Sequence, residues 1–140
     1  MAAAAGALTP LQKVIDETIE YTRSRGAFGK PLLDNQIIHF KLAELQTELD
    51  LMRSMLYLAA DAMIEGQNVT LMASMLKLKC GRLARTITDN CLQFWGGMGF
   101  TEDVYVSRLY RDLRLWSIGG GSDETMLSII SKMMGTMPKK

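Results

Sequence analysis

The chain has 140 residues, of which 48% are hydrophobic and 22% charged, and its net charge is +1. This length supports one domain with a real hydrophobic core, and the near-neutral charge gives no basis for binding nucleic acid or a membrane surface. No apolar run approaches the roughly 18 residues of a membrane-spanning helix. One histidine (His39) and two cysteines far apart in one expected helix (Cys80 and Cys91) argue against a metal site, a histidine-based triad and a disulfide framework. We therefore expect a metal-free protein of a reducing, intracellular setting.

The first expected helix begins at Thr9 and Pro10, where threonine caps the helix and proline takes its first position. It ends near Arg25, and residues 2–5 could extend it backwards, so its start stays open. Residues 26–35 form a connector with glycine and proline. No stretch shows the strict apolar–polar alternation of a strand, so we expect no sheet.

The second expected helix has the clearest periodicity of the chain. Its apolar positions alternate steps of four and three residues: Ile38, Leu42, Leu45, Leu49, Met52, Leu56, Ala59 and Met63. This heptad pattern predicts packing along another long helix at a shallow angle. Residues 66–68 (Gly-Gln-Asn) end the helix.

A third long helix and two shorter ones complete the expected fold. The third carries one apolar face: Met72, Leu76, Cys80, Leu83, Ile87, Cys91 and Phe94. Small residues such as Gly81 let a neighbouring segment approach closely. Shorter helices are expected at residues 104–116 and 122–134, followed by a frayed tail at 135–140. The sequence thus predicts an all-α protein, an up-and-down helical bundle with residues 1–140 as a single domain.

Two glycine-rich turns, residues 96–99 and 119–121, bracket Arg108, Arg111 and Asp112. Glycine lets a ligand approach the main chain, and the helix start at Ser122 offers backbone N–H groups that can hold a phosphate. The simpler interpretation is two turns between helices, with Asp112 paired to Arg108 or Arg111. Neither turn has the Rossmann or P-loop pattern.

Five segments, in this order and spacing, resemble the acyl-CoA dehydrogenase family. They are YTRSRGAFGKP (21–31) with Gln36, KLAEL (41–45), QFWGGMGF (93–100), RLYRD (108–112) and IGGGSDE (118–124). Enzymes of this family have an amino-terminal helical domain, a middle β domain and a carboxy-terminal bundle. The resemblance covers essentially the whole chain, but only the third of these domains, so we expect the other two to be absent from residues 1–140.

The resemblance implies a FAD-dependent desaturation of acyl-CoA thioesters between the α and β carbons. A carboxylate takes the α proton, and the β hydrogen leaves as hydride to FAD N5. For the adenosine diphosphate part of FAD, the positions it implies are Arg25, Ala27, Phe28, Asn35, Gln36, Gln93, Gly96 and Gly97. Several of these would contact the flavin of a neighbouring subunit. For the flavin of the same subunit, the positions it implies are Gly121, Ser122 and Glu124. Without the family, Arg25 could simply end the first helix against its dipole, and Gln36 and Gln93 could be caps or solvent-facing residues.

The catalytic carboxylate is not where most of the family has it. The usual glutamate position, aligned on the RLYRD segment, is Gly120. Glycine there resembles the isovaleryl- and long-chain-type branch, whose glutamate comes from the helix matching our first one. Matching residues 5–8 to that helix puts the glutamate just before Met1. Because Glu17 and Glu20 lie more than three turns further on, we expect no catalytic residue within the chain.

Two interpretations remain. In the first, the chain is the C-terminal bundle of a FAD-dependent acyl-CoA dehydrogenase, contributing FAD contacts and an oligomer core, and inactive alone. In the second, it is a non-catalytic helical oligomerisation module derived from that family. Exposed apolar faces predict a homo-oligomer, a dimer or tetramer, in either case. Acyl-CoA would bind only in a full-length context. The family also implies a mitochondrial location, although no presequence is visible.

Overall fold

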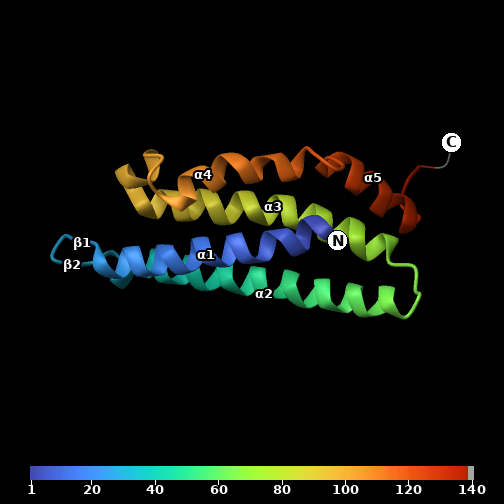
Figure 1. Cartoon of the computed structure of the whole chain (residues 1–140), viewed down its shortest axis with the longest axis horizontal. Coiled ribbons are helices and arrows are strands. Elements are labelled where there is room, and N and C mark those ends of the chain that lie inside the picture. The colour runs from blue at the N-terminus through green and yellow to red at the C-terminus, as the bar shows by residue number, and fades with distance from the viewer. Residues whose placement is uncertain (139–140) are drawn as a thin grey trace.

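The computed structural model describes residues 1–138, in which three long helices lie side by side (Figure 1). They are α1 (Ala2–Ser24), α2 (Gln36–Ile64) and α3 (Thr70–Trp95). The chain then continues through the 3-10 helix η2 (Gly96–Phe100), α4 (Tyr105–Asp112), the 3-10 helix η3 (Leu113–Ser117) and α5 (Asp123–Met133). α3 is central, because it packs against α1, α2, α4 and α5. The predicted helical bundle is confirmed.

The start of α1 differs from its prediction at Thr9 and Pro10. The helix begins at Ala2 and contains Pro10, so the backward extension is the correct alternative. Proline removes one backbone N–H from the helix interior. Packing outweighs that loss, because Ala4 and Ala7 are almost fully buried in the core. The amino end of α1 lies against α3, where the Cys80 thiol is 3.6 Å from the Ala3 carbonyl oxygen.

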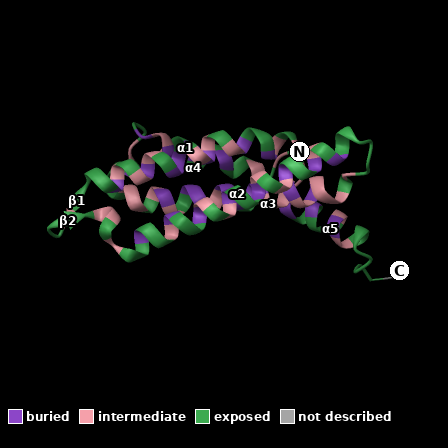
Figure 2. Cartoon of the chain, turned by 90° about the horizontal axis from the view of Figure 1, so that it is seen from below, coloured by how far each residue is buried: buried purple, intermediate pink, exposed green. Residues whose placement is uncertain are grey.

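The predicted heptad seam of α2 is buried from Ile38 to Ala59, facing the other long helices (Figure 2). Its last member is wrong, since Met63 is exposed and Ala62 is buried instead. A straight helix drifts away from a strict seven-residue repeat, which explains the shift. The helix ends at Ile64, Gly66 follows its cap with a φ of +77°, and the Gln67 N–H donates to the Ala62 carbonyl at 2.9 Å. This is a Schellman ending, which requires a residue such as glycine.

Gly81 marks the closest approach between α3 and the chain that follows α4. A Cβ at this position would lie 2.7 Å from Ser117 Oγ and 2.9 Å from the Trp116 carbonyl oxygen. The predicted close approach at this small residue is therefore confirmed. The apolar face of α3 is also confirmed, with its central residues buried from Leu76 to Cys91.

The expectation of no sheet is wrong in one small element. β1 (Gly26–Ala27) pairs antiparallel with β2 (Lys30–Pro31). The two turn residues, Phe28 and Gly29, have φ angles of +54° and +81°. Two positive φ angles in a two-residue loop form the tight turn of a β-hairpin. A 3-10 helix, η1 (Leu32–Asp34), then leads into α2.

The helix expected at 104–116 is divided into α4 and η3, whereas α5 follows its prediction closely. The Ser122 hydroxyl caps α5 by accepting a hydrogen bond from the Thr125 N–H at 3.3 Å. In the expected frayed tail, the Thr136 N–H still donates to the Ser131 carbonyl at 3.0 Å. Residues 139 and 140 of that tail lie outside the described residues. Within residues 1–138, no helix has both the length and the apolar character to cross a membrane.

Candidate functional site: two groups of motif residues

The first group of motif residues surrounds the β-hairpin that follows α1. Arg25 is the exposed residue that caps the carboxyl end of α1, and its carbonyl accepts a hydrogen bond from the Leu32 N–H at 2.9 Å. The Phe28 side chain is 102% exposed at the hairpin tip. Asn35 caps the start of α2, and its side-chain amide donates to the Leu32 carbonyl at 2.9 Å. The hairpin therefore fixes the spacing between Arg25 and the start of α2 at Gln36.

Gln93, Gly96 and Gly97 join this group at the carboxyl end of α3. The rings of Tyr21 and Trp95 stack with centroids 4.0 Å apart, and the Tyr21 hydroxyl donates to the Trp95 carbonyl at 3.3 Å. Figure 1 shows β1, β2 and η2 at the same end of the bundle. The structure thus brings residues 25–36 and 93–97 to one end of the molecule.

A groove of about 700 Å³ opens beside this end of α3. Its lining residues are Leu92, Gln93, Gly96, Gly99, Phe100, Glu102, Ser107, Arg108, Tyr110, Arg111 and Asp112. Asp112 is exposed and forms no ion pair within residues 1–138, so its expected pairing with Arg108 or Arg111 is wrong. Arg108 donates instead to the Glu102 carbonyl at 2.9 Å.

The second group lies at the turn before α5. Gly120 and Gly121 have φ angles of +65° and +104°, and the Lys77 ammonium donates to the Gly121 carbonyl at 3.0 Å. Glu124 is exposed in the first turn of α5. The pKa of its carboxyl lies below its usual value because its own backbone N–H and the Ser122 hydroxyl hydrogen-bond the carboxylate. Glu124 therefore adds a negative charge to the helix start.

The two groups do not converge on one pocket. Lys77, which contacts the second group, and Gln93, which belongs to the first, lie sixteen residues apart on α3. At the helical rise this is about 24 Å. The structure therefore presents two separated groups of motif residues.

Sequence reasoning missed Asp123. It is buried, with 9% of its surface exposed, and one carboxylate oxygen accepts from Arg82 Nε at 3.3 Å and from Arg85 Nη2 at 2.9 Å. This contact ties the first residue of α5 to α3. The sequence does show a pair of arginines three residues apart on α3. No local pattern, however, indicates that they pair with an aspartate about 40 positions away.

The two cysteines and the α1 glutamates, Glu17 and Glu20, are not poised as nucleophile or base. Burial raises the pKa of the Cys80 and Cys91 thiols to about 11, so both stay protonated at neutral pH. Glu17 pairs with Lys13 at 3.6 Å, and Glu20 with Arg23. Among residues 1–138, no cluster of three or more metal-ligating side chains occurs.

The family model that matches residues 1–135 is described as acyl-CoA dehydrogenase, C-terminal domain. The chain is 37% identical over 119 residues to the probable acyl-CoA dehydrogenase YdiO of Escherichia coli (strain K12), which covers 85% of this chain and 31% of that protein. It is 33% identical over 126 residues to the short-chain-specific acyl-CoA dehydrogenase of Megasphaera elsdenii, covering 90% of this chain and 33% of that protein.

Solved structures agree with these sequence relatives. Butyryl-CoA dehydrogenase from Megasphaera elsdenii matches with a TM-score of 0.90 and 32% identity, over 94% of this chain and 34% of that one. An acyl-CoA dehydrogenase from Geobacillus kaustophilus matches with a TM-score of 0.91 and 30% identity, over 94% and 35% of the two chains. The chain thus spans about a third of the length of the proteins it matches.

Proposed function

The chain belongs to the acyl-CoA dehydrogenase family, as its C-terminal domain, and we propose on this basis that it serves as the helical bundle of a FAD-dependent enzyme that desaturates acyl-CoA thioesters. The observation that carries this proposal is the assembly of Arg25, Gln36 and Gln93 at one end of the bundle. Arg25 and Gln36 belong to one motif of the family, and Gln93 belongs to another. Since the chain spans a third of its relatives, the complete activity requires the amino-terminal and middle domains as well.

The first group of residues fits the phosphate and ribose parts of FAD. Arg25 is exposed and forms no ion pair within residues 1–138, so its guanidinium can donate paired hydrogen bonds to a diphosphate. The exposed side-chain amides of Gln36 and Gln93 suit ribose and adenine. No atom lies within 4 Å of the Cβ position at Gly96 or Gly97, which leaves the backbone there open to a ligand. Bound FAD would supply the acceptor for the hydride.

The remaining family positions have smaller parts in this proposal. Ala27 and the exposed Phe28 ring at the hairpin tip offer apolar contact to the cofactor. Asn35 offers its side-chain oxygen and one amide N–H, because its other amide N–H is bonded to the Leu32 carbonyl. Gly121, Ser122 and Glu124 hold a backbone turn and a helix start against the flavin of the same subunit.

The separation of the two groups favours a flavin shared between copies. If residues near Arg25 contact one flavin and those near Gly121 another, a second copy of the chain completes each site. α2 offers a surface for such an assembly, because several apolar residues on one of its faces are 60% to 77% exposed: Ile37, Phe40, Leu51 and Leu58. A row of this kind is typical of an interface. We therefore propose a dimer or tetramer.

The position of the catalytic base is proposed from the resemblance to the family alone. A glycine at position 120 offers no carboxylate, so we propose that residues 1–140 in isolation do not dehydrogenate acyl-CoA.

The expected assignment to the isovaleryl- and long-chain-type branch rests on this glycine alone. The relatives include a short-chain-specific enzyme and give that branch no support. The relatives named above are bacterial, and they give no support to a mitochondrial location.

A non-catalytic oligomerisation module is the second candidate, favoured by the exposed apolar row of α2. The two functions differ in their need for FAD. A chimera tests this: residues 1–135 replace the matching third of Megasphaera elsdenii butyryl-CoA dehydrogenase, and flavin per chain is measured by absorbance. We expect about one flavin per chain, lost on Arg25→Gln and kept in the matched control Arg23→Gln on the same helix. A folded chimera without flavin would favour the oligomerisation module.

A further inference from the structure

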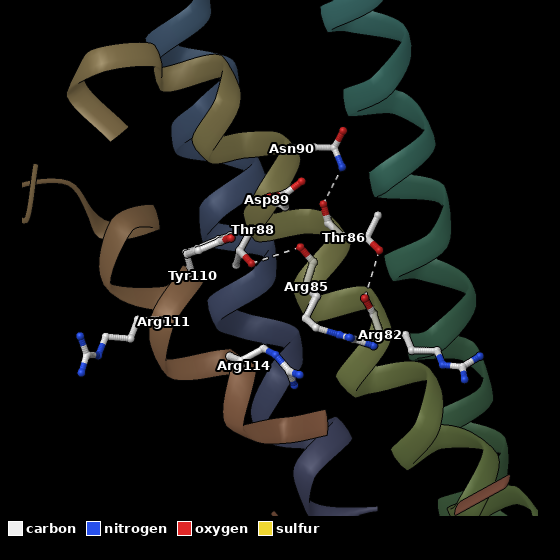
Figure 3. Close-up of a pocket in the computed structure, with 9 residues that line it drawn as sticks. All are labelled: Arg82, Arg85, Thr86, Thr88, Asp89, Asn90, Tyr110, Arg111 and Arg114. Atoms are coloured by element: carbon white, nitrogen blue, oxygen red, sulfur yellow. Dashed lines mark hydrogen bonds between the residues drawn. The ribbon is translucent and has the colours of Figure 1, made fainter. Parts of the chain in front are cut away.

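A second, larger groove lies between α3 and the segment formed by α4 and η3 (Figure 3). Its volume is about 950 Å³. The lining residues are Arg82, Arg85, Thr86, Thr88, Asp89, Asn90, Tyr110, Arg111 and Arg114. Four arginines and one aspartate are among its lining residues, in a chain whose net charge is only +1. Positive charge is therefore concentrated in this groove.

The other polar residues of the α3 wall turn their donors back into the helix. The Thr88 hydroxyl donates to the Ala84 carbonyl at 2.7 Å, and the Asn90 amide donates to the Thr86 carbonyl at 2.8 Å. Figure 3 shows the bond from Asn90 along α3. The donors left for a ligand are the guanidinium groups, the Tyr110 hydroxyl and the second amide N–H of Asn90.

These guanidinium groups keep most of their hydrogen-bonding capacity. Arg82 and Arg85 each give one N–H to Asp123, and an arginine side chain has five. Arg111 and Arg114 form no ion pair within residues 1–138. In Figure 3, Arg114 extends from η3 toward α3, whereas Arg111 points outward at the rim. Arginines thus come from both walls, without a carboxylate to neutralise those of the η3 wall.

We propose that this groove binds the diphosphate group of a small molecule. Its volume lies within the range of about 300–1,000 Å³ that small-molecule sites occupy. A guanidinium fork matches phosphate oxygens with two parallel hydrogen bonds, and two phosphates reach arginines on both walls. None of the residues assigned above to FAD lines the groove, and Gln93 lies eight residues beyond Arg85 on α3, about 12 Å away. The site is therefore distinct from the FAD contacts at Arg25.

Isothermal titration of the whole chain with inorganic pyrophosphate tests the proposal. Arg114 is exposed, so Arg114→Gln leaves the fold intact, which circular dichroism checks. We expect this change to weaken pyrophosphate binding about tenfold or more, since a charged hydrogen bond is lost. Arg23→Gln removes the same charge from α1 and leaves binding within about twofold. Inorganic phosphate binds more weakly than pyrophosphate, whereas ADP binds at least as well, and tighter ADP binding identifies a nucleotide diphosphate.

Three results would overturn the proposal. They are no pyrophosphate binding at low salt, equal weakening by Arg114→Gln and Arg23→Gln, and phosphate binding as tight as pyrophosphate binding. If pyrophosphate fails to bind and Arg114→Gln lowers the mass of the assembly, the groove instead receives an acidic segment of a second copy. A folded chimera without flavin would refute the proposed FAD contacts and leave this site untouched, so the two proposals fail separately.

Discussion

Tyr21 and Trp95 stack almost parallel, with an interplanar angle of 10° and centroids 4.0 Å apart. The contact joins the carboxyl ends of α1 and α3, and these ends carry the motif residues around Arg25 and Gln93. Trp95 also donates from its indole N–H to the Thr18 hydroxyl at 3.0 Å. A single aromatic pair thus positions two segments that lie about 70 residues apart in the sequence.

We expect Trp95→Ala to lower the free energy of unfolding by about 2–4 kcal/mol, because a packed aromatic ring and its hydrogen bonds are lost. Tyr21→Phe removes only one hydroxyl and should cost about 1 kcal/mol or less. Urea unfolding followed by circular dichroism measures both. Tyr57→Ala, at an exposed position of α2, is the control. A Trp95→Ala variant as stable as that control would contradict the role of the stack.

Gly81→Ala should destabilise the chain even though alanine favours helices by about 1 kcal/mol. The new Cβ would meet the Trp116 carbonyl, a backbone group that cannot rotate away, and overpacking costs about 1–3 kcal/mol. Gly6→Ala is the matched change, since nothing lies within 4 Å of its Cβ position in α1. That variant should be more stable than the parent chain in the same urea titration. Equal stability of the two variants would contradict the close packing at Gly81.

Asp123→Asn should loosen α5 from α3. The change removes the negative charge of a carboxylate that pairs with both Arg82 and Arg85 and stabilises the amino end of α5. We therefore expect the free energy of unfolding to fall by about 1–3 kcal/mol. Hydrogen exchange should show faster exchange in α5 than in α2. Glu124→Gln, one residue further and exposed, should have a much smaller effect. Unchanged exchange in α5 would show that the ion pairs do not hold it.

The buried thiols predict a loss of stability at high pH. Their pKa in the folded chain is about 11 against a usual 9.0, so the unfolded state loses these protons first. The stability that the buried, protonated thiols contribute is complete below pH 9, and it disappears as pH rises from about 9 toward 11. The double variant Cys80→Ala and Cys91→Ala should lose less stability over this interval. Parallel pH profiles for the two proteins would contradict the burial effect.

The row of apolar residues on α2 predicts self-association. Leu51→Lys combined with Leu58→Lys should shift the chain to a smaller mass in sedimentation equilibrium, since charge would be buried at the interface. Tyr57→Lys changes an exposed residue on another face of the same helix and tests for charge alone. A parent chain that stays monomeric at every concentration would refute the proposed oligomer.

The sequence predicts the long helices well because their burial is periodic, as the seam from Ile38 to Ala59 shows. The sequence-based prediction fails where contacts between residues distant in the sequence determine the structure. Burial of Ala4 and Ala7 carries α1 through Pro10, and strands of two residues are too short to show alternation at the hairpin. The motif residues are predicted by resemblance alone, since no local pattern reveals the stack of Tyr21 on Trp95. The pairing of Asp123 depends on the folded arrangement of α3 and α5.

The most direct test of the proposed function is the visible absorbance of the isolated chain after incubation with FAD and gel filtration. We predict a colourless chain, because residues near Arg25 and Gly121 form separate partial sites that need the other domains. The chimera described above should retain about one flavin per chain in the same experiment. One flavin retained per isolated chain would contradict the partial sites, and a folded, colourless chimera would contradict the FAD contacts themselves.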